Sequence, residues 1–271
     1  MLVTLVCAVA AGAAWWFWLR PVEIALAPPP VVAAPPAPAA PPPAPEASGP
    51  QNPVDALAPP DAALPALAES DARVTELLAE LLGRDKLATF LQTDGFVRRV
   101  VATVDNLPRA SAAARLWPVQ PTPQRFLVDE AQGRIASANA ARYGALLSFA
   151  EAVPLERAVG LYTRLYPLFQ QAYEELGYPG RYFNDRLVAV LDHLLQAPEL
   201  EQAPQVQLLE IRGAMADPRP WVRYEFSDPA LQSLSAGQKI MVRMGLANER
   251  RAKTVLAELR RQLATGAAPA R

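Results

Sequence analysis

Apolar residues recur with the period of an α-helix along most of the chain between residues 64 and 265. The first example follows Ser70, which suits a helix N-cap, and ends before Gly83, which suits the position beyond a helix end. Between them, one helix face carries Val74, Leu77, Leu78, Leu81 and Leu82. The pattern therefore predicts a helix over this segment.

The same spacing predicts a series of further helices. Asp94 suits the N-cap of a helix over residues 96–104, which Pro108 stops, and Asn248 suits the N-cap of the last helix. Ser235 suits the N-cap of the helix over residues 235–245. The other helices are expected over residues 85–91, 138–152, 154–177, 181–196 and 235–245, with a short one that begins at Asp228.

Two pairs of short β-like runs interrupt the helices. Residues 126–128 and 134–135 can pair as a small hairpin. Residues 206–211 and 221–226 contain β-branched and aromatic residues, which favours a second antiparallel pair. The predicted fold class is therefore mainly α, a single helical domain over residues 64–265 with a minor β-hairpin element.

The start of the chain has a different pattern, an uncharged apolar run over residues 1–19. At about 1.5 Å per residue, a helix of this length approaches the hydrocarbon thickness of a bilayer. Its end carries the aromatic residues Trp15, Trp16, Phe17 and Trp18, which suit the membrane interface. We predict a transmembrane signal-anchor helix over residues 1–20. A cleaved signal peptide is the alternative, with a cleavage site after residues 25–27.

The next segment combines many prolines with almost no charge. Residues 28–60 hold 14 prolines, and their only charged residues are Glu46 and Asp55. This composition favours extended polyproline II over a helix or a packed core. We predict a disordered Pro/Ala-rich linker over residues 21–63 and a disordered tail over 266–271. A ligand for a proline-binding module is the alternative interpretation of the linker.

Orientation follows from the absence of positive charge after the apolar run. Residues 21–72 contain no Lys or Arg, so nothing in them resists translocation. We therefore expect a single pass through a bacterial inner membrane, with the bulk of the chain in the periplasm.

Charge and rare residue types exclude several functions. The 26 Lys and Arg residues nearly balance 27 Asp and Glu, which gives a net charge of −1, whereas nucleic-acid binding through phosphates requires a basic excess. One Cys and one His cannot build a Cys/His zinc site or a disulfide framework. No G-x-G-x-x-G or Walker pattern occurs. We expect no nucleic-acid partner, no metal site and no cofactor.

Catalytic motifs are also absent from the sequence. It has no G-x-S-x-G motif, and its single imidazole is His193. The neighbouring Asp192 points about 100° away from His193 on a helix, so it cannot orient the ring as a triad aspartate does. We predict no catalytic residue. The alternative is a hydrolase that uses carboxylates near an aromatic region, with three candidates: Glu174, Glu175 and Asp185.

Two local features are candidates for partner binding. Four aromatic residues recur at i, i+4, i+7 and i+11 and share one helix face: Tyr162, Tyr166, Phe169 and Tyr173. They either pack in the core or form an exposed groove for a peptide or glycan. The second candidate is a polar turn with Asp105, Asn106 and Arg109. It serves either local capping or partner binding.

Three longer runs carry a resemblance to a known family. They cover residues 96–109, 161–169 and 238–245, and the first contains Val-Asp-Asn-Leu-Pro-Arg. Over residues 64–263 the sequence resembles an uncharacterised proteobacterial family of membrane-anchored proteins, domain of unknown function three thousand and fourteen. The resemblance implies a single-pass anchor, a low-complexity linker and a domain with no assigned activity. It brings no catalytic residues.

Together these features favour a non-catalytic binding or scaffold module that is anchored in the inner membrane and faces the periplasm. Its expected partners are the membrane and an envelope protein or cell-wall polymer, and its oligomeric state stays open. The competing hypothesis is a carboxylate-dependent peptidoglycan hydrolase.

Overall fold

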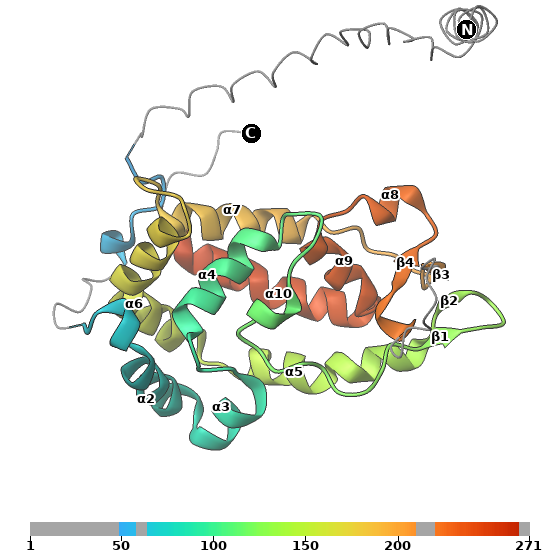
Figure 1. The fold of residues 1–271 in the computed structure, drawn as a ribbon, viewed down its shortest axis with the longest axis horizontal. Helices are drawn as coiled ribbons and strands as arrows, with labels where there is room; N and C mark the ends of the chain where they lie inside the picture. Colours follow the sequence, from blue (N-terminus) through green and yellow to red (C-terminus); the bar gives the residue numbers. More distant parts are fainter. Residues whose placement is uncertain (1–48, 58–63, 210–219, 266–271) are drawn as a thin grey trace, which may run out of the picture. The chain divides into compact units, whose positions relative to one another are not determined.

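A computed structural model describes residues 49–57, 64–209 and 220–265 (Figure 1). The predicted anchor over 1–20, most of the predicted linker and the predicted tail over 266–271 lie outside these residues. Within the described ranges, no helix is long and apolar enough to cross a membrane. The described residues form a mainly helical domain with two small antiparallel hairpins, which confirms the mainly α fold class.

Each helix that the sequence predicts is present, with somewhat different bounds. The longer helices are α2 (Asp71–Leu82), α4 (Phe96–Asn106), α5 (Ala141–Glu151), α6 (Leu155–Glu175), α7 (Phe183–Leu195) and α10 (Leu246–Leu263). The shorter ones are α3 (Arg84–Phe90), α8 (Pro229–Gln232) and α9 (Ala236–Arg243). Short 3₁₀ helices lie at Val54–Ala56, Leu67–Glu69, Ala114–Leu116, Ser137–Ala140 and Pro220–Val222.

The helices enclose a shared apolar core. Helix α4 packs against α6 and α7, and α10 packs along α7 with further contacts to α5 and α6 (Figure 1). The side chains of Val74, Val97, Val101 and Phe183 are buried where α2, α4, α6 and α7 meet. Complete burial of one such side chain stabilises a fold by about 1.5–3 kcal/mol. The helical periodicity of the sequence therefore identifies the face that each helix turns inward.

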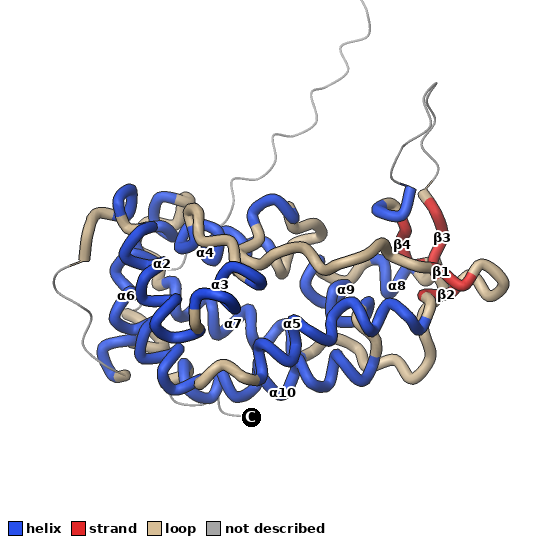
Figure 2. The backbone as a smooth tube through the Cα atoms, turned by 90° about the horizontal axis from the view of Figure 1, so that it is seen from below, coloured by secondary structure: helices blue, strands red, loops and turns tan. Residues whose placement is uncertain are grey.

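The described strands lie together at one end of the domain, beside α8 and α9 (Figure 2). The antiparallel pairs are β1 (Val128–Asp129) with β2 (Arg134–Ile135), and β3 (Val206–Leu208) with β4 (Tyr224–Phe226). Val206 lies opposite Phe226, and both are buried in a small apolar cluster with Ile135 and Val242. Both predicted hairpins are confirmed, with strands shorter than the predicted runs.

Two of the predicted N-caps make no capping bond. Helix α4 begins after Gly95, whose φ of +61° is a conformation that glycine adopts at little cost, and Asp94 plays no capping role. Ser70 occupies the N-cap position of α2, but its hydroxyl donates backwards to the carbonyl of Leu67. In both cases a turn that precedes the helix determines where the helix begins.

The last helix also begins earlier than predicted. Helix α10 starts at Leu246, so Asn248 lies within its first turn rather than at the N-cap. The Asn248 amide donates to the carbonyl of Ala140 at 2.8 Å, which ties α10 to the start of α5. The N-cap of α9 is confirmed, because Ser235 accepts a hydrogen bond from the backbone N–H of Gln238 at 3.2 Å.

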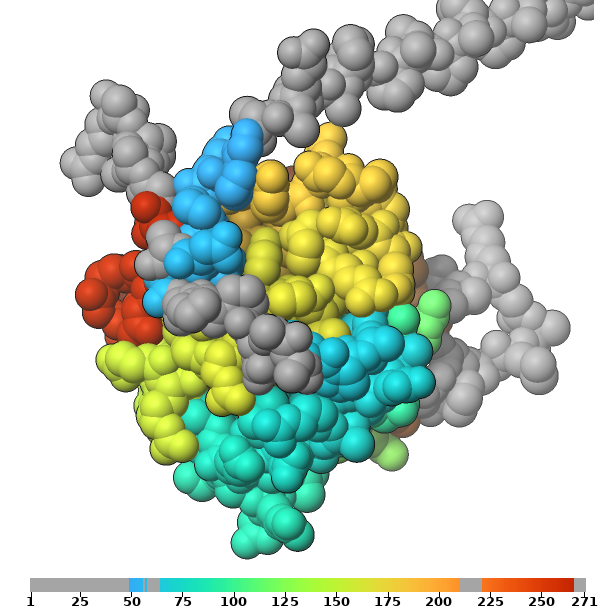
Figure 3. Space-filling model, turned by 90° about the vertical axis from the view of Figure 1, so that its left-hand side faces the viewer, coloured from blue at the N-terminus to red at the C-terminus, as the bar shows by residue number. Residues whose placement is uncertain are grey.

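Residues 49–57 pack against the start of α7 and the end of α10 (Figure 3). The Asp185 carboxylate accepts hydrogen bonds from the backbone N–H groups of Gln51 and Asn52, at 2.9 and 2.7 Å. Val54 is buried. This segment therefore belongs to the folded domain, whereas the sequence predicted linker as far as residue 63. Its composition alone does not show the carboxylate and the apolar surface that hold it.

Candidate functional site

The aromatic face of α6 lies mainly inside the domain. Phe169 and Tyr173 are 5% and 3% exposed. Phe169 stacks on Phe183 with ring centroids 5.8 Å apart, and Tyr173 stacks on Tyr178 at 4.6 Å. These two rings are occupied by packing, so they do not form the exposed groove that the sequence allowed.

The other two residues of that face, Tyr162 and Tyr166, are half-buried. The Tyr162 hydroxyl donates to Oδ1 of Asn184 at 3.1 Å, and the Tyr166 hydroxyl donates to Oε1 of Gln170 at 3.0 Å. Burial raises the pKa of Tyr166 to about 12 and that of Tyr162 well above its usual value. Both hydroxyls therefore stay protonated and act as donors within the domain.

The polar turn is built around a buried carboxylate, Asp105, whose side chain is 3% exposed. Nη2 of Arg186 donates to its Oδ1 at 3.2 Å, and the Tyr178 hydroxyl donates to its Oδ2 at 3.3 Å. Arg109 also donates to Oδ2, and attraction to Asp105 raises the pKa of Arg109. Two guanidinium groups thus balance a charge that would be costly to bury alone. We call these four residues the Asp105 cluster.

Helix α9 holds the same turn from the other side. The N–H groups of Ala236 and Gly237 donate to the carbonyls of Arg109 and Leu107, at 2.7 and 2.8 Å. A Cβ at Gly237 would lie 2.4 Å from Cδ2 of Leu194 and 3.1 Å from the carbonyl oxygen of Leu107, so a larger residue would displace its neighbours. Asn106 donates to the carbonyl of its own helix at Ala102. The contacts of this turn are those of a structural joint between α4, α7 and α9.

Among the described residues, no aspartate is hydrogen-bonded to the single histidine. Asp192 pairs with Arg260, at 3.0 Å between Nη2 and Oδ2. Nε2 of His193 lies 2.8 Å from the Ser235 hydroxyl, which is itself the N-cap of α9. The Ser235 oxygen also accepts from the backbone N–H of Gln238, so this contact joins α7 to the N-terminus of α9. The prediction that Asp192 and His193 point apart is confirmed.

The three carboxylates of the hydrolase hypothesis have structural partners. Glu174 accepts from the Gln170 amide and Glu175 from Arg98, both at 2.8 Å. Asp185 holds the backbone of residues 51 and 52. In the described ranges, no group of three His, Cys, Asp or Glu residues could hold a metal ion.

An open cavity of 440 Å³ lies between the loop after α4, helix α5 and strand β4. Its aromatic lining residues are all half-buried: Trp117, Phe126, Tyr143, Trp221 and Tyr224. Arg142 and Arg243 complete its polar wall. We call this cavity the aromatic cleft.

A second cavity of 550 Å³ continues the aromatic cleft along α9. The two cavities share part of their walls, including Trp117, Tyr224 and Arg243, and we call them together the hollow. Lys239 and Glu225 line the second cavity.

Arg142 fixes the loop that forms one side of the aromatic cleft. Its guanidinium donates to the Thr122 hydroxyl at 3.1 Å and to the carbonyls of Pro123 and Gln124, at 3.0 and 3.3 Å. Gln124 has a φ of +64°, and no other non-glycine residue of the described ranges has a positive φ. Strained backbone of this kind persists where surrounding contacts enforce it, and it often occurs at functional sites.

Two donors in the wall of the aromatic cleft have no acceptor. Neither the indole Nε1 of Trp117 nor Nε of Arg243 reaches solvent or a hydrogen-bond partner among the described residues. Nη2 of Arg243 donates to the carbonyl of Tyr224 at 2.9 Å, and burial lowers the pKa of the Arg243 guanidinium. Unsatisfied buried donors are uncommon, and each requires an explanation.

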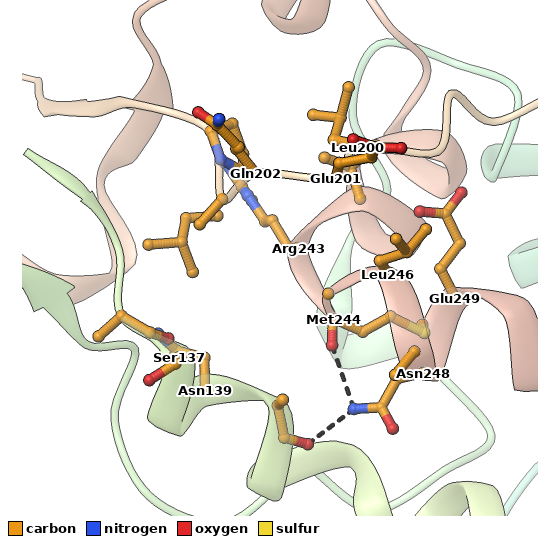
Figure 4. Close-up of a pocket in the computed structure, with 18 residues that line it drawn as sticks. Ser137, Asn139, Leu200, Glu201, Gln202, Arg243, Met244, Leu246, Asn248 and Glu249 are labelled. Atoms are coloured by element: carbon orange, nitrogen blue, oxygen red, sulfur yellow. Dashed lines mark hydrogen bonds between the residues drawn. The ribbon is translucent and has the colours of Figure 1, made fainter.

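A third cavity, of 280 Å³, lies behind Arg243 and next to the start of α10 (Figure 4). Glu249, which is 1% exposed, lines it and lies 3.2 Å from Nζ of Lys253. Burial raises the pKa of Glu249. Figure 4 shows the Glu249 and Arg243 side chains directed to different sides of this cavity, so they do not neutralise each other.

Fold and site together define a mainly helical domain with an open aromatic cleft and no assembled catalytic set among its described residues. Residues 96–260 match the family described as Protein of unknown function (DUF3014), and the chain belongs to this family. The match confirms the resemblance and includes both the Asp105 cluster and the aromatic cleft. Comparisons with curated proteins and with solved structures find no match.

Sequence reasoning missed the aromatic cleft. Its rings come from positions as far apart as Trp117, Tyr143 and Trp221, which no local period connects. A weak signal was present, because residues 110–124 form an irregular segment that carries a tryptophan and several prolines.

Proposed function

We propose that the protein is a single-pass membrane protein of the bacterial cell envelope whose domain binds a protein or cell-wall partner without catalysis. The apolar run over 1–19 and the absence of Lys and Arg over 21–72 support an anchor with the domain in the periplasm. The prolines of residues 28–60 support a spacer between anchor and domain.

The observation that carries the binding role is the aromatic cleft. Half-buried aromatic side chains around an open hollow are typical of recognition surfaces, because they offer large contact areas at a low entropy cost. Arginines in the same wall supply polar contacts that can orient a partner. The other candidate groups, in the Asp105 cluster and on α6, are committed to packing and to hydrogen bonds within the domain.

The binding role is tested by photo-crosslinking of the full-length protein in cells. A photoreactive amino acid replaces Val222, which is 64% exposed and lines the aromatic cleft. The matched control carries it at Tyr182, which is 38% exposed at the start of α7. We expect a discrete crosslinked product from position 222 and none from position 182. Equal labelling from both positions, or none from either, contradicts the proposal.

The proposed location is tested separately by cysteine labelling. The single native thiol is removed by Cys7→Ala, and Leu127→Cys places a thiol at a residue that is 44% exposed in the domain. A membrane-impermeant maleimide should label this thiol in cells whose outer membrane alone is permeable. Labelling that requires lysis of the inner membrane would refute a periplasmic domain.

A further inference from the structure

We propose that the aromatic cleft binds an extended, proline-rich peptide that carries carboxylates, with Arg243 as the contact for the acidic groups. This inference rests on the proposed binding function and names the chemistry of the partner. Three observations support it: the charge of the hollow, the lack of a direct carboxylate partner for Arg243, and the excess of donors in the cleft wall.

The hollow is cationic although the chain as a whole is nearly neutral. Arg142, Arg243 and Lys239 line it, and Arg125 stacks on Trp221 at its rim, with Cζ 3.9 Å from the ring centroid. Of the described residues that line the hollow, Glu225 is the one acid. Interfaces pair surfaces of opposite charge, so the partner should be acidic.

Arg243 is the cation with the least compensation. The Arg142 guanidinium donates to the loop over residues 122–124, whereas none of the ion pairs found among the described residues joins a carboxylate to Arg243. Nη2 of Arg243 donates to the Tyr224 carbonyl at 2.9 Å, and its Cζ lies 5.2 Å from the centroid of the Phe226 ring. Glu225 attracts the Arg243 guanidinium but forms no direct ion pair with it. A partly buried cation without a direct carboxylate partner is unfavourable, and a carboxylate from a ligand would offset that cost.

The wall of the aromatic cleft also offers more donors than acceptors. Its polar side chains are guanidinium groups, two indole N–H groups and hydroxyls, and among the described lining residues Gln124 alone carries a side-chain carbonyl. A proline segment presents carbonyl oxygens but no N–H groups, so it supplies what this wall lacks.

The same wall fits a glycan less well. Sugar hydroxyls donate as well as accept. The O–H groups of a bound sugar would therefore lack acceptors in a wall that holds few of them. Aromatic-lined grooves bind extended proline-rich segments because such segments lose little entropy on docking. The partner that fits the described contacts is therefore an acidic, extended, proline-rich peptide.

Fluorescence anisotropy tests this with the full-length protein in detergent. The probes are labelled peptides of equal length built from Glu-Pro-Pro, Gln-Pro-Pro or Lys-Pro-Pro repeats. We expect the Glu-Pro-Pro probe to bind about tenfold more tightly than the Gln-Pro-Pro probe and to weaken with added salt. Equal binding of the two, or a preference for the Lys-Pro-Pro probe, overturns the inference.

Two variants locate the acidic contact. Arg243→Gln should weaken the Glu-Pro-Pro probe about tenfold, while the control Arg98→Gln, whose exposed side chain pairs with Glu175, should leave it unchanged. Because Arg243 also donates to the backbone of β4, Val222→Glu provides a second variant at a cleft position whose residue is 64% exposed. It should weaken the Glu-Pro-Pro probe several-fold and strengthen the Lys-Pro-Pro probe. No change with either variant places the contact elsewhere and overturns the inference.

Failure of this inference can be distinguished from failure of the proposed function. If soluble peptidoglycan fragments bind and none of the peptides does, a glycan occupies the cleft and the peptide inference is overturned. Crosslinking at position 222 in cells would then still support a binding domain. If no probe binds and position 222 forms no crosslink, both proposals fail.

Discussion

Two groups of aromatic residues in this domain have opposite roles. On α6, Tyr162, Tyr166, Phe169 and Tyr173 share one helix face and pack largely into the core. Around the aromatic cleft, five rings from separate segments stay half-buried beside an open hollow. The first group is conspicuous in the sequence and structural in the fold. The second is scattered in the sequence and forms the candidate site.

The difference has a physical cause. Residues at helical spacing lie on one face of one helix, and a long apolar face is stabilised when other helices cover it. Rings that arrive from a loop, a helix and a strand meet at the edge of the packed layers, where coverage is incomplete. Trp221 shows this, because it is covered on one face by the Arg125 guanidinium rather than by a core residue.

The largest expected effect tests this contrast directly. Phe169→Ala should lower the free energy of unfolding by about 3–5 kcal/mol, because it leaves a cavity in the core between α6 and α7. Trp221→Ala removes a larger ring but should cost no more than about 1 kcal/mol, since its environment is half open. Chemical denaturation followed by circular dichroism measures both. Similar losses for the two variants would remove the distinction between core and cleft.

The helices could be predicted from sequence because periodicity and packing agree there. The apolar spacing of α2, α4, α6 and α7 is satisfied by neighbouring helices, so element type and inward face both follow from local pattern. Helix starts were less predictable, because competing signals lie within one or two residues. At α4, the positive φ of Gly95 determines the start, although Asp94 is the better capping side chain.

The candidate site could not be predicted to the same extent. The Asp105 turn was identified as a feature, but its partners Tyr178 and Arg186 lie far along the chain and meet it only after folding. The aromatic cleft depends on the same kind of long-range contact, between the loop near Trp117 and strand β4. Local hydrophobic periodicity carries no information about contacts between residues that are distant in the sequence. The site can therefore be identified only from the tertiary structure.

A second prediction asks whether the Asp105 cluster behaves like the core or like the cleft. Asp105→Ala should lower the free energy of unfolding by about 3 kcal/mol, because it leaves the Arg186 guanidinium without its buried counter-charge. The control Arg109→Ala should cost less than about 1 kcal/mol, since that side chain is 54% exposed. Thermal and chemical denaturation report both losses. A small loss for Asp105→Ala with impaired partner crosslinking would instead assign the cluster to the binding surface.

The third prediction compares one tyrosine from each aromatic group. Tyr162→Phe removes the hydroxyl that donates to Asn184 and should cost about 1 kcal/mol of unfolding free energy. Tyr143→Phe, at the aromatic cleft, should change stability by less than about half of that value. The pair is measured by the same denaturation assay. A larger loss at Tyr143 would show that the cleft wall contributes to the core.

The smallest expected effect concerns two buried acids rather than two aromatic groups. Asp105 has two guanidinium partners, whereas Glu249 forms its ion pair with Lys253, and burial raises the pKa of Glu249 above its usual 4.5 despite Lys253 and the nearby Arg250. Just above pH 4.5 the folded protein therefore retains a proton on Glu249 that the unfolded chain has released. Protonation of Glu249 therefore contributes fully to stability below pH 4.5. The unfolding free energy should fall as the pH rises above that value.

Glu249→Gln isolates this effect because glutamine cannot titrate. The unfolding free energy of the variant should decline less steeply just above pH 4.5 than that of the parent, as measured by denaturant midpoints across the window. Glu151→Gln is the matched control with the opposite sign: a hydrogen bond from Arg251 lowers the pKa of Glu151, so its contribution is present above pH 4.5 and is lost as pH falls. Glu151→Gln should therefore make the increase of the unfolding free energy with pH less steep. If both variants change the pH dependence of the unfolding free energy in the same direction, the buried Glu249 does not differ from the surface acid Glu151 in the way proposed.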